Sequence, residues 1–280
     1  MRTLLLIASL LALAGCDSAE TELPEPGPNA RVALEKVMPA DSVLAGLAIA
    51  PDGSRYVLDE SRGLFLLKPN GQPAQWVLDT EVLGLLVTDV VALDSERLAI
   101  TVENDGYLLN RTTNLFSSYF CYLPPLPGEG GSDGGGLGSE PISVSQTLRS
   151  SGIEVKQRTD SVAYSSETRQ LFAQPRTTRL DTGGIAGSEL FSFDEQGGQP
   201  TSVLSFADPN FIAGGMVASD GARLFAGAQN RVFEITPDGA MRRAQELAPT
   251  INITGMARDP TGTIWILDGA GRQLLALSPL

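Results

Sequence analysis

Residues Gly46–Gly71, with the sequence GLAIAPDGSRYVLDESRGLFLLKPNG, decide the fold of this chain. An apolar run at 46–50 meets a Pro-Asp-Gly turn at 51–53, and a second run follows at 55–58. A third run at 64–67 ends in a Pro-Asn-Gly turn. Short apolar runs separated by turn residues are typical of consecutive antiparallel strands. The stretch therefore predicts a β-meander.

The first of these turns recurs along the chain. With the Asp-Gly pair at 52–53 as a ruler, matching points fall at residues 94–95, 167–168, 220–221 and 261–262. The segment before the first turn and the segment after the last turn together make up one more repeat. A unit that recurs in this way is typical of a β-propeller, in which each repeat forms one sheet of the ring.

The ends of the chain are expected to meet. Residues 31–37 (RVALEKV) alternate like a strand, and the C-terminal repeat lacks an outer strand of its own. We expect this N-terminal strand to pair with the C-terminal blade and close the ring. A ring closed in this way has no free sheet edge in the closing blade.

The repeats resemble NHL-type and related six-bladed β-propellers. The similarity is clearest at 46–71 and in the last repeat, GMARDPTGTIWILDGAGRQLLAL, and it covers most of residues 31–280. The spacing fits five four-stranded blades, with a Gly-rich insertion at 124–141 and a second insertion near 175–187. The resemblance instead favours six blades, one of them degenerate. The sequence thus predicts an all-β fold, a β-propeller of five or six four-stranded blades.

Composition narrows the chemistry. The 280 residues include no histidine, which removes the commonest general base and zinc ligand. The formal net charge of −13 repels phosphate backbones, so nucleic acid is not an expected partner. The sequence shows no nucleophile elbow, phosphate-binding loop or zinc pattern.

The N-terminus predicts the compartment. A basic start is followed by an apolar run at 3–13 that is too short to span a bilayer, as in an export signal. The following Leu-Ala-Gly-Cys at 13–16 resembles the bacterial lipoprotein signal. We therefore expect residues 1–15 to be a signal peptide and Cys16 to carry acyl chains such as palmitate. Residues 16–30 would be a flexible, Pro-rich tether. The resulting location is the cell envelope, facing the periplasm, with inner and outer membrane both open.

Three acidic residues are candidates for a site at the channel mouth. Asp59 and Asp268 occupy the same position of the repeat, six residues after the turn glycine, and Glu103 follows a strand of the second blade. A loop-capping role, with the carboxylate accepting turn amides, is the leading interpretation of the two aspartates. Alternatively, Asp59, Glu103 and Asp268 face the mouth and bind a cation or a basic group.

Two functions follow from these patterns. The first is a membrane-anchored binding module without catalysis, whose partner is an envelope protein or a small polar ligand and which needs no cofactor. The alternative is a divalent-metal-dependent, lactonase-like hydrolase with an ion such as Ca²⁺ in the channel. This alternative comes from the resemblance to SMP-30/gluconolactonase propellers, whose Glu, Asn and Asp metal ligands have no match with similar flanking residues here.

Overall fold

The fold comes from a computed structural model. It describes residues 30–68, 72–79, 87–103, 105–121, 149, 151–197, 200–206, 208, 210–219, 223–236 and 240–277. Cys16, the predicted signal peptide and the Gly-rich insertion at 124–141 lie outside the described residues. Among the residues described, no helix is long and apolar enough to cross a membrane.

In the described part of the chain, twenty strands form five antiparallel sheets of four strands each. The first blade contains β2 (Leu44–Ile49), β3 (Arg55–Asp59), β4 (Gly63–Leu67) and β5 (Gln75–Asp79). The second contains β6 (Val87–Ala92), β7 (Arg97–Val102), β8 (Asp105–Asn110) and β9 (Phe116–Cys121). The third contains β10 (Val155–Ser165), β11 (Gln170–Arg179), β12 (Ile185–Asp194) and β13 (Ser202–Ser205).

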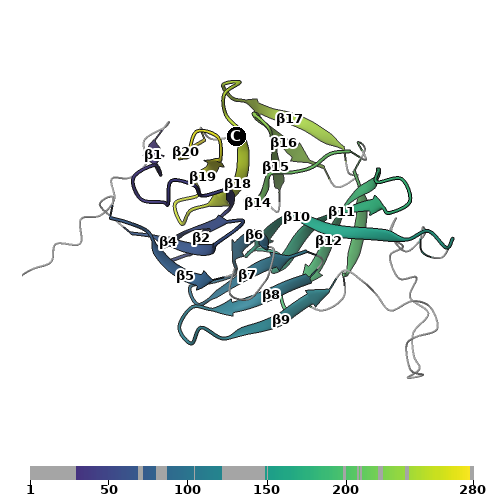
Figure 1. The fold of residues 1–280 in the computed structure, drawn as a ribbon, viewed down its shortest axis with the longest axis horizontal. Coiled ribbons are helices and arrows are strands. Elements are labelled where there is room, and N and C mark those ends of the chain that lie inside the picture. The colour runs from purple at the N-terminus through teal and green to yellow at the C-terminus, as the bar shows by residue number, and fades with distance from the viewer. Residues whose placement is uncertain are drawn as a thin grey trace, which may run out of the picture.

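The fourth blade contains β14 (Gly215–Ala218), β15 (Leu224–Ala228), β16 (Arg231–Ile235) and β17 (Met241–Glu246). The fifth contains β18 (Ile253–Arg258), β19 (Ile264–Asp268), β20 (Gln273–Ala276) and, as its outer strand, β1 (Arg31–Ala33). The sheets surround a common axis with β2, β6, β10, β14 and β18 innermost (Figure 1). This is a five-bladed β-propeller, so the spacing predicts the blade number correctly and the resemblance to six-bladed rings does not.

The hydrophobic core is divided among the five contacts between neighbouring blades. Each cluster of buried apolar residues draws on two adjacent sheets, and one of them joins Leu47 and Val57 of the first blade to Trp265 and Leu267 of the fifth. Both faces of most sheets are therefore covered. This explains why the inner strands read as continuous apolar runs rather than alternating ones.

The N-terminal strand closes the ring as predicted. Arg31, Val32 and Ala33 pair with Leu275, Leu274 and Gln273 of β20. The strand is shorter than the predicted 31–37, because the amides of Val37 and Met38 turn back to the carbonyl of Leu34. Leu34 and Met38 instead enter the core between the fifth and first blades.

The insertion predicted near 175–187 is not a separate loop. It lengthens two strands, since β11 and β12 have ten residues each and pair beyond the level of the other blades. Their hairpin projects from the ring in Figure 1. Turn residues such as Gly183 and Gly184 mark only the tip of the hairpin.

Four of the five inner strands have a bulge at the same level. Register shifts occur at 44/46 in β2, 87/89 in β6, 159/161 in β10 and 253/255 in β18. Each shift leaves one extra residue without a cross-strand partner, and the four are Ala45, Thr88, Asp160 and Thr254. Bulges redirect side chains and often occur next to functional sites. Asp160 is therefore a charged residue at a bulge position where β2, β6 and β18 have an uncharged one.

Candidate functional site

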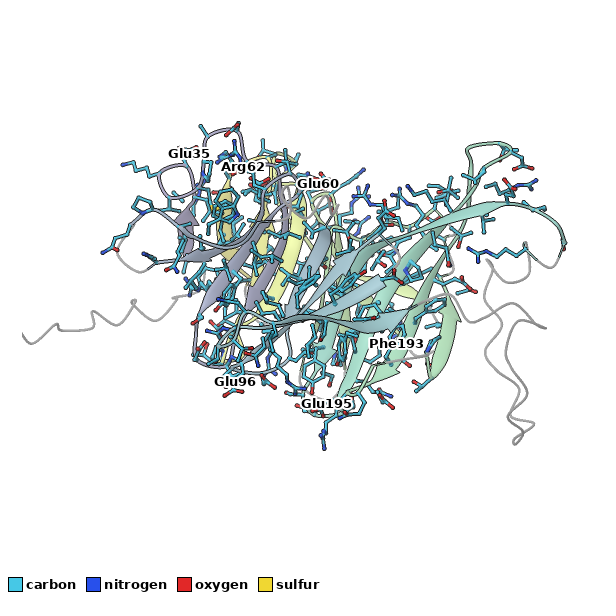
Figure 2. The ribbon with its side chains drawn as sticks, turned by 60° about the horizontal axis from the view of Figure 1, so that its bottom comes forward. Glu35, Glu60, Arg62, Glu96, Phe193 and Glu195 are labelled. Atoms are coloured by element: carbon cyan, nitrogen blue, oxygen red, sulfur yellow. The ribbon has the colours of Figure 1, made fainter. Side chains whose placement is uncertain are left out.

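The channel of the ring has two different ends. We call the end where the inner strands begin the amino end, and the end where they finish the carboxyl end. Figure 2 shows Glu60 and Arg62, which follow β3, on the opposite side of the propeller from Glu96 and Glu195. The former pair marks the amino end and the latter pair the carboxyl end.

A cavity of about 370 Å³ opens at the carboxyl end. Every blade contributes to its wall through the last residues of its inner strand, namely Ile49, Ala92, Tyr164, Ala218 and Arg258. Cavities of this size are typical of sites for small ligands. Because the wall is assembled from five strand ends, its shape depends on the closed ring rather than on one loop.

The cavity has an apolar floor and a polar rim. Below it lies a throat of about 60 Å³, lined at one level by Ala48, Val91, Ala163, Val217 and Ala257. The rim carries the hydroxyls of Ser165, Ser166 and Ser219 and the charges of Glu167 and Arg258. A molecule with an apolar part and a polar or charged head would match this arrangement.

Asp259 on the rim is held by its own turn. Its Oδ1 accepts hydrogen bonds from the amides of Thr261 and Thr263 at 2.9 and 3.0 Å and from the Thr261 hydroxyl at 2.6 Å. Its Oδ2 accepts the indole N–H of Trp265 at 2.8 Å. The guanidinium of Arg55 covers the Trp265 ring, 4.4 Å from the centroid. With these partners on both of its oxygens, Asp259 orders the turn.

Between the two ends, the channel is constricted at the level just after the bulges. The residues there are Gly46, Asp89, Ser161, Gly215 and Gly255, one from each inner strand. A Cβ on Gly255 would lie 2.7 Å from the amide nitrogen of Leu47 in β2, and one on Gly46 would lie 2.7 Å from Asp89 Oδ1. The inner strands approach so closely here that three of the five positions need glycine.

Asp89 ties β6 to β10 at this constriction. Its Oδ2 accepts the Ser161 hydroxyl at 3.0 Å and the Val162 amide at 2.9 Å, and its Oδ1 accepts the Val90 amide at 2.8 Å. Only 2% of the residue is exposed. Burial raises the pKa of the Asp89 carboxyl to about 8, although the three hydrogen bonds act to lower it. Burial thus favours the protonated form of the carboxyl, and the three donors favour the ionised form.

The structure places Asp59 and Asp268 in buried turns at the amino end. Asp59 Oδ1 accepts the amides of Ser61 and Arg62 at 3.0 and 3.2 Å. Asp268 Oδ1 accepts the amides of Asn252 and Gly271, both at 3.0 Å, and its Oδ2 accepts Gln273 Nε2 at 2.6 Å. Both residues are at most 1% exposed. These contacts are those of loop-capping carboxylates.

The third candidate, Glu103, is exposed. Its backbone has φ 49°, its carbonyl accepts the Thr159 amide at 2.7 Å, and its Oε1 lies 3.9 Å from Lys156 Nζ. Strand pairing places Val102 of β7, the residue before Glu103, at the position that Asp59 has in β3. The three candidates thus share the amino end, but Asp59 and Asp268 are engaged in separate turns.

Sequence reasoning missed two acidic residues, Asp89 and Asp160. Asp160 pairs with Arg176 at 3.1 Å, and burial raises its pKa to about 6 although Arg176 and Arg158 lower it. The available signal was a single carboxylate inside an inner strand: Asp89 in TDVVAL and Asp160 in RTDSVAY. In the described part of the chain, no group of three or more cysteine, aspartate or glutamate side chains is arranged to hold a metal ion.

Comparison with known proteins supports the fold. No protein-family model and no curated protein matches the chain. Among solved structures, a gluconolactonase from Xanthomonas campestris is similar at 11% identity and a TM-score of 0.50, over 86% of this chain and 74% of that one. A streptogramin B lyase is similar at 12% identity and a TM-score of 0.44, over 89% and 98% of the two chains. At 11% identity the similarity to the gluconolactonase shows a shared β-propeller fold alone.

Proposed function

We propose that this chain is a lipid-anchored protein of the bacterial cell envelope whose propeller binds a small ligand without catalysing a reaction. The observation that carries the proposal is the cavity at the carboxyl end, with its wall from all five blades, apolar throat and polar rim. Asp259 on its rim accepts hydrogen bonds from its own turn and from Trp265, and among the described residues no set of metal ligands is grouped together. These features support binding better than hydrolysis.

The position of β1 is consistent with an anchored cavity. Arg31 pairs with Leu275 near the end of β20, and the Ala30 carbonyl accepts the Ala276 amide at 2.9 Å. The described chain therefore enters the propeller at the carboxyl end of the channel. In this proposal only a short stretch of sequence separates the acylated Cys16 from the end of the propeller that carries the cavity.

The anchor is tested by replacing each cysteine in turn. Cys16→Ser is expected to move the protein from the membrane fraction to the soluble periplasmic fraction and to abolish labelling with a palmitate analogue, because the thiol that accepts the acyl chain is removed. Cys121→Ser is the matched control and should remain membrane-bound and labelled. Membrane association and labelling that persist in Cys16→Ser would contradict the proposal.

The cavity is tested with 8-anilinonaphthalene-1-sulfonate, an anionic probe with an apolar ring system that suits the throat and Arg258. We expect saturable binding to the folded full-length protein in detergent. Ala92→Phe, which fills the wall from the second blade, should weaken binding at least about tenfold, or ~1.4 kcal/mol. Thr113→Phe, in an exposed turn before β9, should not change it.

Two outcomes would count against this assignment. One is the absence of binding, and the other is equal affinity in Ala92→Phe, provided that its circular dichroism and melting temperature match the wild type. A hydrolase would behave differently: Ca²⁺ or Zn²⁺ would raise the melting temperature and stimulate hydrolysis of gluconolactone. The proposed binding module should show neither effect.

A further inference from the structure

A charged surface of β10 lies at the other end of the channel, away from the cavity. β10 has 11 residues, whereas β2, β6, β14 and β18 have four to six. In its first half the buried residues Gln157 and Thr159 alternate with Lys156, Arg158 and Asp160. Because strand side chains alternate, Lys156 and Arg158 share one side of the strand. Asp160, at the bulge, reaches the same side, since it contacts Arg176, the residue paired opposite Arg158.

This side of β10 reaches two other blades. Arg158 Nη2 contacts Glu60 Oε1 at 3.1 Å, and Lys156 Nζ lies 3.9 Å from Glu103 Oε1. Glu60 belongs to the first blade, which is separated from the third by the whole second blade. The Arg158–Glu60 pair therefore bridges the amino end of the channel. Both side chains are about one third exposed, at 36% and 34%, so the pair is readily exchanged for another.

Asp160, the bulge residue of β10, lies in the same cluster and is buried. Its side chain is 6% exposed, and its Oδ1 accepts Arg176 Nη2 at 3.1 Å. Its other oxygen, Oδ2, is buried and has no hydrogen-bond partner in the described part of the chain. Burying an unpaired polar atom is unfavourable, so an orphaned carboxylate oxygen points to a missing donor.

Arg158, in turn, has a hydrogen-bond donor without an acceptor. Strand pairing puts it directly opposite Arg176, whose guanidinium pairs with Asp160. Glu60 uses only one nitrogen of Arg158, and Nε is buried and unpartnered among the described residues. A guanidinium offers Nε–H and Nη–H as a fork that fits both oxygens of a carboxylate. A free carboxylate could therefore replace Glu60 with better geometry.

We propose that the amino end of the channel binds a small zwitterion, such as a free α-amino acid. Its carboxylate takes the place of Glu60 on the Nε and Nη2 of Arg158, and its ammonium group donates to Asp160 Oδ2. A simple anion would leave Asp160 Oδ2 unpartnered, and a simple amine would leave Arg158 Nε unpartnered. A zwitterion also keeps the cluster neutral, since Lys156, Arg158 and Arg176 face Glu60, Glu103 and Asp160.

This site is separate from the cavity at the carboxyl end, and the two can be tested independently. The experiment is isothermal titration of the full-length protein in detergent with glycine, L-alanine, acetate and methylamine at constant pH and ionic strength. We expect saturable binding of the two amino acids only. Arg158→Gln and Asp160→Asn should each weaken it at least tenfold, because each removes one of the two charged contacts.

Glu60→Gln provides the decisive variant. Removing the competing carboxylate should strengthen amino-acid binding several-fold, which a merely structural role of Glu60 would not do. Because Glu60 is partly exposed, this variant is expected to fold even if those in β10 do not. Glu234→Gln, which breaks the Arg223–Glu234 pair of 2.8 Å on the fourth blade, is the matched control and should bind like the wild type.

Three results would overturn the proposal. The first is the absence of binding of either amino acid at about 10 mM. The second is acetate binding as tightly as glycine with no effect of Asp160→Asn, which would show a plain anion site. The third is unchanged or weaker amino-acid binding in Glu60→Gln. If the amino acids do not bind but the probe still binds at the carboxyl end, the proposed function is not affected.

Discussion

Replacing Gly215 with alanine is expected to destabilise the propeller by about 3 kcal/mol or more. A Cβ at this position would lie 2.6 Å from the carbonyl carbon of Gly255 and from the amide nitrogen of Met256. These are backbone atoms of β18, the neighbouring inner strand, so no side chain can rotate away. The strands would have to separate, which would loosen the contact between the fourth and fifth blades.

The matched control is Gly184→Ala in the β11–β12 turn. Its φ is not positive, and the nearest atom to a new Cβ is Thr182 Oγ1 at 3.4 Å. We expect denaturant unfolding of Gly184→Ala to resemble the wild type within about 0.5 kcal/mol. Equal stability of Gly215→Ala and Gly184→Ala would show that the inner strands are not packed as closely as the structure indicates.

The same constriction suits a ring of only five blades. Three of the five positions have no side chain, because they are Gly46, Gly215 and Gly255. Asp89 and Ser161, at the other two positions, are hydrogen-bonded to each other. Five inner strands can therefore pack around a narrow axis. The turn pattern predicted the blades because turn chemistry is local and repeats in the sequence. The small residues at the centre were equally visible in the sequence, but their common level appears only once strand register is known.

The candidate site was less predictable for a related reason. Asp59 and Asp268 attract attention because each follows a strand in a repeated position, and their roles are set by nearby turn amides. The cluster around Asp160 includes a contact that crosses the ring, the pair between Arg158 and Glu60, 98 residues apart. Sequence periodicity carries no information on such contacts. Likewise, the added length of β11 and β12 could not be distinguished from a loop in the sequence, because its polar residues interrupt the apolar pattern of a strand.

The second large effect concerns pH and Asp89. The wild-type protein is expected to lose stability as the pH rises from about 6 to 8, by roughly 1.4 kcal/mol per pH unit near pH 6 and about half of that near pH 8. Burial raises the pKa of Asp89 from 3.8 to about 8, so between these values the folded state keeps a proton that the unfolded state releases. The stabilisation is complete below the unfolded pKa and is lost as the pH rises through the folded pKa. Asp160, whose pKa is raised to about 6, contributes with the same sign mainly below that pH.

Asp89→Asn should remove this pH dependence. The asparagine Oδ1 can accept from Ser161 and Val162 as Asp89 Oδ2 does, but its amide group faces the Val90 N–H, which costs about 1 kcal/mol. The variant should therefore be less stable than the wild type at pH 6 and more stable at pH 9, where the wild type must bury a charge. Urea unfolding at pH 6, 7, 8 and 9 measures both curves, and Asp160→Asn is the control that retains the slope above pH 6. Parallel curves for the wild type and Asp89→Asn would show that Asp89 is already ionised in the folded protein. The contact between β6 and β10 would then be made by a buried carboxylate that accepts three hydrogen bonds.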